Sequence, residues 1–266
     1  MNKKIVLIIS TLLVLILLIT IIQSCDNPAE PISETTASHF LLPAKKGNYW
    51  EYKGIIPDIG SVDTALVYKN FSSFGIVLNS NVPTRDFRWE IVDSINIKLD
   101  NVIYPSYVFD FFFYDQNEYS NFNKAYWFGE DGIYNTGIFE KGVDTVFSKG
   151  LYIPSNVPLN KNWNGTAVYS YDGKLTSGNV KERRCISKNE LIETPLGKYN
   201  CYVIYTREDE ADDYILYVDS YEYFAPNIGL VAKVELRIVP KIDDITRHLG
   251  WWKIKYAYMI TDFSLN

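Results

Sequence analysis

The chain of 266 residues has little histidine and little cysteine: His39, His248, Cys25, Cys185 and Cys201 are all it contains. A Ser-His-Asp triad needs a positioned imidazole, and neither histidine stands in a pattern that supplies one. The histidines and cysteines also lack zinc-ligand spacing, and the chain has no phosphate-binding loop or dinucleotide fingerprint. The sequence therefore predicts no catalytic residue, no metal and no cofactor, and it favours a protein that is not an enzyme.

Basic residues are also scarce, since 26 Lys and Arg face 32 Asp and Glu, for a net charge of −6. Nucleic-acid binding requires basic patches, so the composition excludes nucleic acid as a partner and disfavours adhesion to anionic lipid by charge alone. Acids are densest in the run EDEADD at 208–213. This run lacks the glycine and the ordered spacing of a calcium loop, so we interpret it as a solvated hairpin tip, with a calcium site as the alternative.

Charge is absent from Ile5 to Ile22, and this run follows Lys3 and Lys4. A basic start before an apolar run is the secretory pattern. The run ends in Ile22-Gln23-Ser24-Cys25, which resembles the bacterial lipobox. This resemblance implies cleavage before Cys25 and attachment of acyl chains such as palmitate to it. An uncleaved membrane helix is the alternative, because the run would reach about 27 Å.

The sequence predicts three consecutive parts. Residues 1–24 are a lipoprotein signal peptide, and residues 25–39, which are polar and contain two of the prolines, are a disordered tether. Residues 40–266 form a single antiparallel β domain. A weak echo between 43–50 and 158–163, each with Pro, Lys and Trp, leaves open two β units split near residue 150.

Strand-like alternation dominates the mature chain, which is rich in tyrosine, phenylalanine and tryptophan. From Ile228 to Ile238, apolar residues alternate with Lys233, Glu235 and Arg237, which predicts a half-buried strand with its charged face in water. Further strands are predicted at 61–71, 87–99, 102–114, 166–171, 199–206, 214–223 and 252–260. We therefore expect an all-β, mainly antiparallel fold: a large curved sheet, half-barrel or barrel-like, with little helix outside the signal peptide.

Cys185 and Cys201 flank the turn Thr194-Pro195-Leu196-Gly197. If this turn joins two antiparallel strands, Cys201 faces residue 190, and Cys185 lies about 17 Å away at the rise of a strand. That separation is too large for a disulfide, so two buried free thiols are predicted. An oxidising compartment keeps a bridge as the alternative.

The aromatic strand from Tyr104 to Tyr114 carries phenylalanine on both faces. Such a strand is buried on both sides, or it lines an apolar concavity. Core packing is the default interpretation, and the concavity would suit an apolar ligand. The candidate ligand-facing aromatics are Trp50, Tyr52, Phe109, Phe111 and Phe113.

Three stretches also resemble a loosely defined family of uncharacterised secreted lipoproteins that is common in Bacteroidetes. They are LPAKKGNYWEY at 42–52, ETPLGKYNCY at 193–202 and YFAPNIGLV at 223–231. The resemblance implies a relationship to the open, curved antiparallel sheets of periplasmic lipoprotein carriers. It implies no activity, and each stretch also has a structural interpretation. Gly47 and Gly197 would supply turns, and Gly229 would permit close backbone approach or seat a bulge.

Together these patterns predict a lipid-anchored protein of the cell envelope, at the outer membrane, with the membrane as its first partner. Its expected role is non-enzymatic binding of an apolar small molecule or an envelope protein through the curved sheet. A structural or assembly accessory of an envelope complex is the alternative, and an envelope hydrolase is the third.

Overall fold

Twelve β-strands make up the regular structure of the described part of the chain. The computed structural model describes residues 41–55, 85–115, 118–139, 146–163, 166–171, 174–209, 217–239 and 251–266. Every helix or strand element in these ranges is a strand, which confirms the all-β prediction. The strands are β1 (Tyr49–Ile55), β2 (Arg85–Leu99), β3 (Val102–Asp115), β4 (Glu118–Gly129), β5 (Gly132–Phe139), β6 (Val146–Pro154), β7 (Thr166–Tyr171), β8 (Lys174–Thr194), β9 (Gly197–Asp209), β10 (Tyr217–Ala225), β11 (Gly229–Val239) and β12 (Trp251–Ser264).

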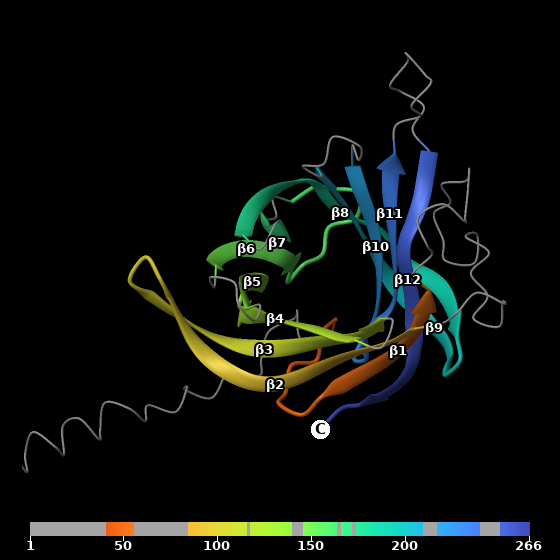
Figure 1. Cartoon of the computed structure of the whole chain (residues 1–266), viewed down its shortest axis with the longest axis horizontal. Helices are drawn as coiled ribbons and strands as arrows, with labels where there is room; N and C mark the ends of the chain where they lie inside the picture. Colours follow the sequence, from red (N-terminus) through yellow and green to blue (C-terminus); the bar gives the residue numbers. More distant parts are fainter. Residues whose placement is uncertain are drawn as a thin grey trace, which may run out of the picture. The chain divides into compact units, whose positions relative to one another are not determined.

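The strands follow the order β6-β5-β4-β3-β2-β1-β12-β11-β10-β9-β8-β7 in one sheet. All neighbouring pairs are antiparallel. The first and last strands join the two runs of hairpins, because β1 pairs with both β2 and β12 (Figure 1). Strands before and after residue 150 therefore belong to a single hydrogen-bonded sheet.

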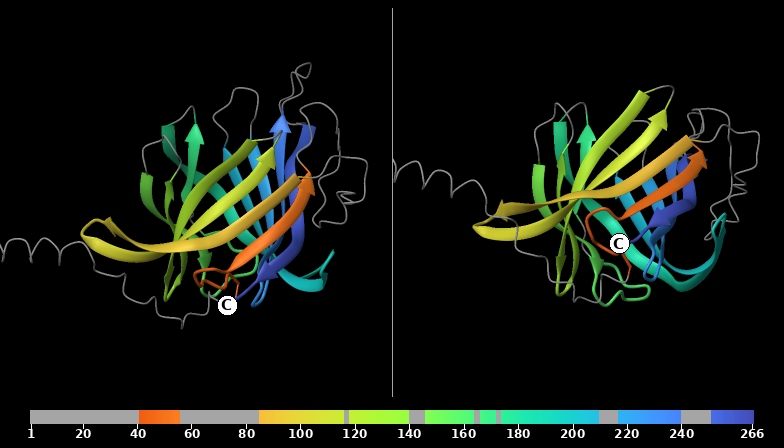
Figure 2. Two further views of the ribbon diagram at one scale, coloured as in Figure 1. Left: turned by 60° about the horizontal axis from the view of Figure 1, so that its bottom comes forward. Right: turned by 90° about the horizontal axis from the view of Figure 1, so that it is seen from below.

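The sheet is strongly curved, and its two edge strands, β6 and β7, contact each other (Figure 2). The segment after β6 reaches across to β8: the N–H of Asn160 donates to the carbonyl of Cys185 at 2.8 Å, and the N–H of Trp163 donates to that of Arg183 at 2.9 Å. The prediction of a large curved antiparallel sheet is confirmed. We call the concave side of this sheet the inner face and the opposite side the outer face.

The predicted strands at 87–99, 102–114, 166–171, 199–206, 214–223 and 252–260 correspond to β2, β3, β7, β9, β10 and β12 within a few residues. Asp100 and Asn101 form the two-residue turn between β2 and β3, with φ of 47° and 66°. Both values are typical of the mirror-image turns that suit the twist of a hairpin. The predicted strand at 61–71 lies outside the described residues.

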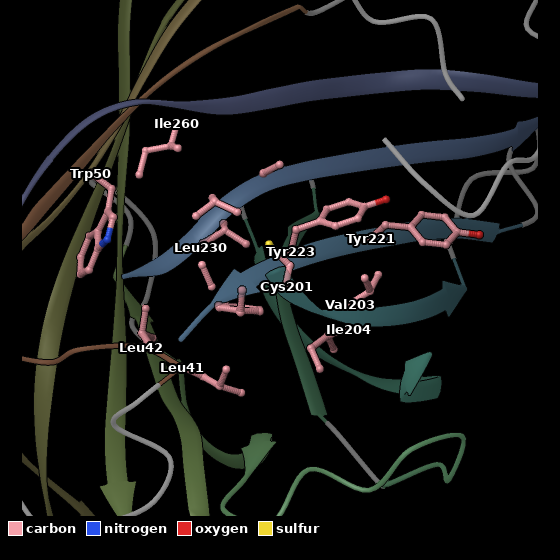
Figure 3. Packing of buried hydrophobic residues seen from close by; sticks show 14 of the residues in the cluster. Leu41, Leu42, Trp50, Cys201, Val203, Ile204, Tyr221, Tyr223, Leu230 and Ile260 are labelled. Atoms are coloured by element: carbon pink, nitrogen blue, oxygen red, sulfur yellow. The ribbon is translucent and has the colours of Figure 1, made fainter. Parts of the chain in front are cut away.

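Residues 41–48 close one end of the curved sheet. Leu41 and Leu42 are fully buried, and they lie near Trp50, Leu230 and other core residues (Figure 3). The loop is fixed by hydrogen bonds, since the side-chain amide of Asn48 donates to the carbonyl of Pro43 at 3.1 Å. The N–H of the C-terminal Asn266 donates to the side-chain oxygen of Asn48 at 2.8 Å, so both ends of the described chain meet here.

Two of the family-like stretches pack on each other. The indole of Trp50 donates to the carbonyl of Ile228, and the hydroxyl of Tyr52 donates to that of Leu230 at 3.0 Å. Gly229 lies between these partners with φ of 109°, and a Cβ there would lie 2.9 Å from the indole nitrogen of Trp50. The close approach at Gly229 therefore comes from the side chain of Trp50, whereas the sequence suggested an approach of backbones.

Cys185 and Cys201 are buried free thiols, as predicted. Cys201 faces Glu190 in the β8–β9 ladder, which is the register on which that prediction depended. Burial raises the pKa of the Cys201 thiol to about 12, so this thiol stays protonated at neutral pH.

Candidate functional site

Charged side chains gather on the inner face of the sheet, where an apolar core was expected. Three cations and three acids come from five strands. In the sheet order four further strands separate β4 from β11, so it is the curvature of the sheet that brings the side chains of these two strands together. We call this group the inner-face charge cluster. Its members are Lys124 on β4, Arg183 on β8, Glu208 on β9, Glu222 on β10, and Lys233 and Glu235 on β11.

The closest ion pair of the cluster joins Arg183 to Glu222. The Nη2 atom of Arg183 lies 2.9 Å from the Oε2 atom of Glu222, and the two side chains are only 7% and 5% exposed. Arg183 also donates through Nη1 to the hydroxyl of Thr206 at 2.7 Å and through Nε to the carbonyl of Tyr152 at 2.8 Å. Its guanidinium is thus satisfied on three sides, as a buried ion requires.

The second carboxylate oxygen of Glu222 also has partners. The hydroxyl of Tyr152 donates to its Oε1 at 3.0 Å, and the Nζ of Lys233 lies 3.5 Å from the same atom. Burial acts to raise the pKa of Glu222, but Lys233 and Arg183 outweigh it and hold this pKa below the ordinary value. Glu222 is therefore a carboxylate at neutral pH and the centre of the cluster.

Lys233 lies between two acids, with its Nζ 3.5 Å from a carboxylate oxygen of both Glu222 and Glu235. Burial alone would lower the pKa of Lys233, yet the two carboxylates keep it well above its ordinary value. Lys233 is 16% exposed at its side chain and Glu235 10%. These ions are thus shielded from water and neutralise each other.

The predicted solvent exposure of the charged face of β11 is wrong for Lys233 and Glu235. The strand itself is confirmed as Gly229–Val239, but this face of it points into the curve of the sheet. Alternation of apolar and charged residues shows only that the two faces differ, and it does not show whether the polar one meets water or other buried ions.

The predicted hairpin tip at 208–213 is also wrong for Glu208. Glu208 belongs to β9, and burial raises the pKa of its carboxyl, with Glu235 acting in the same direction. Residues 210–213 lie outside the described residues, so the calcium alternative stays a hypothesis for them.

Lys124 has an amine whose pKa is lowered, unlike that of Lys233. Burial lowers its pKa to about 8, and the positive charge of Lys233 adds to this effect. Its Nζ lies 5.5 Å from the centre of the Phe111 ring, within the range of a cation–π interaction. An approaching anion would favour the protonated form of this amine and raise its pKa.

The predicted aromatics lie beside the charge cluster. Trp50, Tyr52, Phe109 and Phe111 all belong to the buried core, and the side chain of Phe113 lies outside the described residues. A series of ring contacts leads toward the ions: Trp50 to Phe109 at 6.3 Å, Phe109 to Tyr126 at 5.1 Å and Tyr126 to Tyr152 at 5.2 Å between ring centres. The inner face thus has an aromatic part and an ionic part in contact through Tyr152.

Sequence reasoning predicted the aromatic part and missed the ionic part. One signal was present, because Glu222 stands alone as a charge within the run SYEYFA. Charges inside otherwise apolar strands indicate buried ions. Their pairing could not be predicted from local sequence. Arg183 and Glu222 meet because β8 and β10 both flank β9, and Lys124 comes close to them only through the curvature of the sheet.

The described residues contain no group of three or more His, Cys, Asp or Glu side chains arranged to hold a metal ion. Within the same ranges, no helix is long and apolar enough to span a membrane. Cys25, His39 and His248 lie outside these ranges.

No protein-family model matches the chain, and no curated protein matches its sequence. Among solved structures, a Bacteroides fragilis protein described as exported and as having a YmcC-like fold aligns with a TM-score of 0.51 and 11% identity, over 85% of this chain and 99% of that one. The chain shares this fold. A protein described as a lipoprotein from Parabacteroides distasonis aligns with a TM-score of 0.47 and 14% identity, over 87% of this chain and 100% of that one. At these identities the likeness concerns the fold alone.

Proposed function

We propose that this chain is a non-enzymatic binding protein of the cell envelope, anchored at the outer membrane through an acylated Cys25. The N-terminal pattern supports the anchor, and the B. fragilis protein that shares the fold is itself described as exported. The ligand binds on the inner face, where the aromatic series adjoins the charge cluster.

The inner-face charge cluster carries this proposal. Taking ions out of water is costly, and replacing a buried ion pair by apolar residues is often neutral or stabilising for the fold. A cluster of six charged residues is therefore poorly explained by stability. Groups with shifted pKa values that converge from several strands are typical of functional sites.

The ligand that fits this face is an amphipathic anion. Its apolar part would pack at Tyr152, the partly exposed end of the aromatic series, as expected of the apolar ligand that the sequence suggested. Its acidic group would approach Lys124, whose pKa of about 8 would rise on contact with an anion. Arg183 and Lys233, which pair with Glu222 and Glu235, would help to position the ligand.

Native purification tests this function. The full chain, extracted in a maltoside detergent, should retain small molecules that mass spectrometry identifies as acidic amphiphiles. The variant Lys124→Met should lose them while remaining folded, because it removes a poorly solvated charge. Lys98→Met, at an exposed position of β2, is the matched control and should keep the ligand.

Two results would contradict the proposal: an empty wild-type protein, or equal retention of the same molecules by the Lys124→Met and Lys98→Met variants. Retention by a refolded, ligand-free chain on adding the identified compound would separate specific binding from carry-over during extraction.

Docking to a second envelope protein is the alternative function, and the β2–β3 hairpin favours it. The hairpin extends beyond the strands beside it (Figure 2), because β4 pairs with β3 only as far as Ser106. At its tip Val102 and Ile103 are 49% and 60% exposed. Exposed apolar side chains on a projecting element suit a protein contact. Changing both to lysine should release a bound partner from the purified complex, whereas Leu196→Lys, at another hairpin turn, should not.

A further inference from the structure

Three aromatic rings surround one ammonium group on the strands nearest the β6 edge of the sheet. The Nζ of Lys149 on β6 lies 4.9 Å from the ring centre of Tyr104 on β3, 4.7 Å from that of Trp127 on β4, and 4.6 Å from that of Tyr134 on β5. All three distances are within the range of a cation–π interaction. We call these three rings the aromatic cage.

The cage lies on the outer face, away from the charge cluster. Successive side chains of a strand point to opposite faces, and Trp127 stands between Tyr126 and Phe128. Tyr126 contacts Phe109 and Tyr152 on the inner face. The cage is thus a separate site, and it does not depend on the proposed function.

The rings are held in place without Lys149. Trp127 faces Tyr134 directly in the β4–β5 ladder, with ring centres 5.1 Å apart, and it meets Tyr104 edge to face at 4.9 Å. The indole lies across Gly129, where a Cβ would come within 2.7 Å of its Cη2 atom, so glycine leaves the space that the ring takes. The hydroxyl of Tyr134 donates to the carboxylate of Asp131.

Lys149 is an occupant that a better cation can displace. It is exposed to solvent, and its primary ammonium is strongly hydrated, so water competes with the rings for it. A quaternary ammonium is poorly hydrated and presents methyl groups to all three rings, which is why aromatic cages recognise such groups. The carboxylate of Asp131, hydrogen-bonded to one ring, adds a negative charge at the rim.

We propose that the aromatic cage of Tyr104, Trp127 and Tyr134 binds a quaternary ammonium group in place of the ammonium of Lys149. Lys149 acts as a built-in competitor, since a tethered group has an effective concentration on the order of millimolar. The quaternary ammonium belongs either to a free solute such as choline or to a lipid headgroup, which present the same chemistry to the cage.

The test is a titration of the full chain, in maltoside detergent, with tetramethylammonium, observed through the methyl proton signal of the ion. Ring currents should shift this signal upfield on binding. Removing the competitor in Lys149→Ala should tighten binding by about tenfold, the equivalent of one moderate cation–π interaction. The control Lys98→Ala should bind like the wild type.

Removing a ring should abolish the gain. Trp127→Leu combined with Lys149→Ala should bind at least tenfold more weakly than Lys149→Ala alone, by the same estimate of one cation–π contact. Because Trp127 packs on Gly129, Tyr104→Leu in the same background serves as a second variant with less risk to the fold. The near-UV circular dichroism of each variant shows whether the remaining rings keep their arrangement.

Two further arms identify the source of the group, using a Lys149→Ala chain that also carries Cys25→Ser, so that it has no acyl anchor and needs no detergent. They use choline, and vesicles of phosphatidylcholine or phosphatidylglycerol. Binding to phosphatidylcholine alone among the vesicles assigns the lipid headgroup, and binding of choline without vesicle binding assigns a free solute. If Lys149→Ala keeps its near-UV spectrum and neither tetramethylammonium, choline nor phosphatidylcholine binds, the proposal is overturned.

Discussion

Individual residues of the inner face differ in what they contribute to stability. Glu222 is contacted by Arg183, Tyr152 and Lys233, so three donors depend on one carboxylate. Glu51 also forms an ion pair with an arginine, Arg88, but its side chain is 41% exposed. The two acids therefore provide a direct comparison of a buried and an exposed ion pair in one sheet.

Glu222→Gln should destabilise the fold by about 3–5 kcal/mol, because it leaves Arg183 and Lys233 without a compensating charge in a buried site. Glu51→Gln should cost at most about 1 kcal/mol, since water screens its pair. Urea unfolding of both variants measures the difference. Equal losses for the two variants would show that the inner-face ions are solvated.

Lys124 should give the stability of the protein a distinct pH dependence. Its pKa is about 8 in the folded chain and near 10.5 when unfolded, so between these values the unfolded chain binds more protons. The contribution of Lys124 to the free energy of unfolding therefore rises with pH across this window.

Lys124→Met removes that contribution. The variant should be more stable than the wild type by about 1–3 kcal/mol at pH 7, and this advantage should shrink as the pH rises from 8 to 10.5. Taking the difference between the two proteins cancels groups common to both, such as Cys201, whose pKa is about 12. A difference that stays constant from pH 7 to 10.5 would mean that Lys124 is charged throughout.

At the scale of single elements, turns and strand ends explain two of the three family-like stretches. Thr194 closes its own hairpin, because its hydroxyl accepts from the N–H of Leu196 and donates to the carbonyl of Gly197. Gly197 and Gly229 both have positive φ, of 134° and 109°. They differ in their surroundings, since nothing lies within 4 Å of a Cβ at Gly197, whereas Trp50 fills that space at Gly229.

Substituting these two glycines by alanine distinguishes the cost of an unfavourable φ from the cost of a steric clash. Gly197→Ala should cost about 1–2 kcal/mol through its unfavourable φ alone. Gly229→Ala should cost about 1–3 kcal/mol more, because its methyl group would displace the indole of Trp50 from the carbonyl of Ile228. Denaturant unfolding gives both values. If the two substitutions cost the same, Trp50 moves aside freely and does not fix the end of the sheet.

The elements also show what the sequence could predict. Alternation and turn residues are local, so strands such as β3, β7 and β11 and the Asp100–Asn101 turn were predictable from the chain itself. The hairpin register was equally local, and it led correctly to the free thiols of Cys185 and Cys201. The charge cluster and the aromatic cage combine strands that pairing and curvature bring together, and no local pattern contains that information.

At the scale of the whole molecule, the lipid on Cys25 is the only membrane attachment that the proposal includes. Each buried methylene contributes about 0.8 kcal/mol to membrane binding, so two or three acyl chains hold a protein stably where one does not. The acidic chain, with its net charge of −6, gains nothing from anionic headgroups. One substitution at Cys25 should therefore remove membrane attachment and leave the fold unchanged.

Cys25→Ser should move the protein from the membrane fraction to the soluble fraction of the envelope, provided that a separate signal peptidase removes the leader. Mass spectrometry of the wild-type N-terminus should find an acylated Cys25 and no residue before it. The soluble variant should unfold in urea at the wild-type midpoint, because residues 41–266 hold the described sheet and Cys25 lies outside them. A Cys25→Ser protein that stays in membranes with a processed N-terminus would place the membrane contact on the sheet instead, and the exposed tip at Val102 and Ile103 would then be the first surface to test.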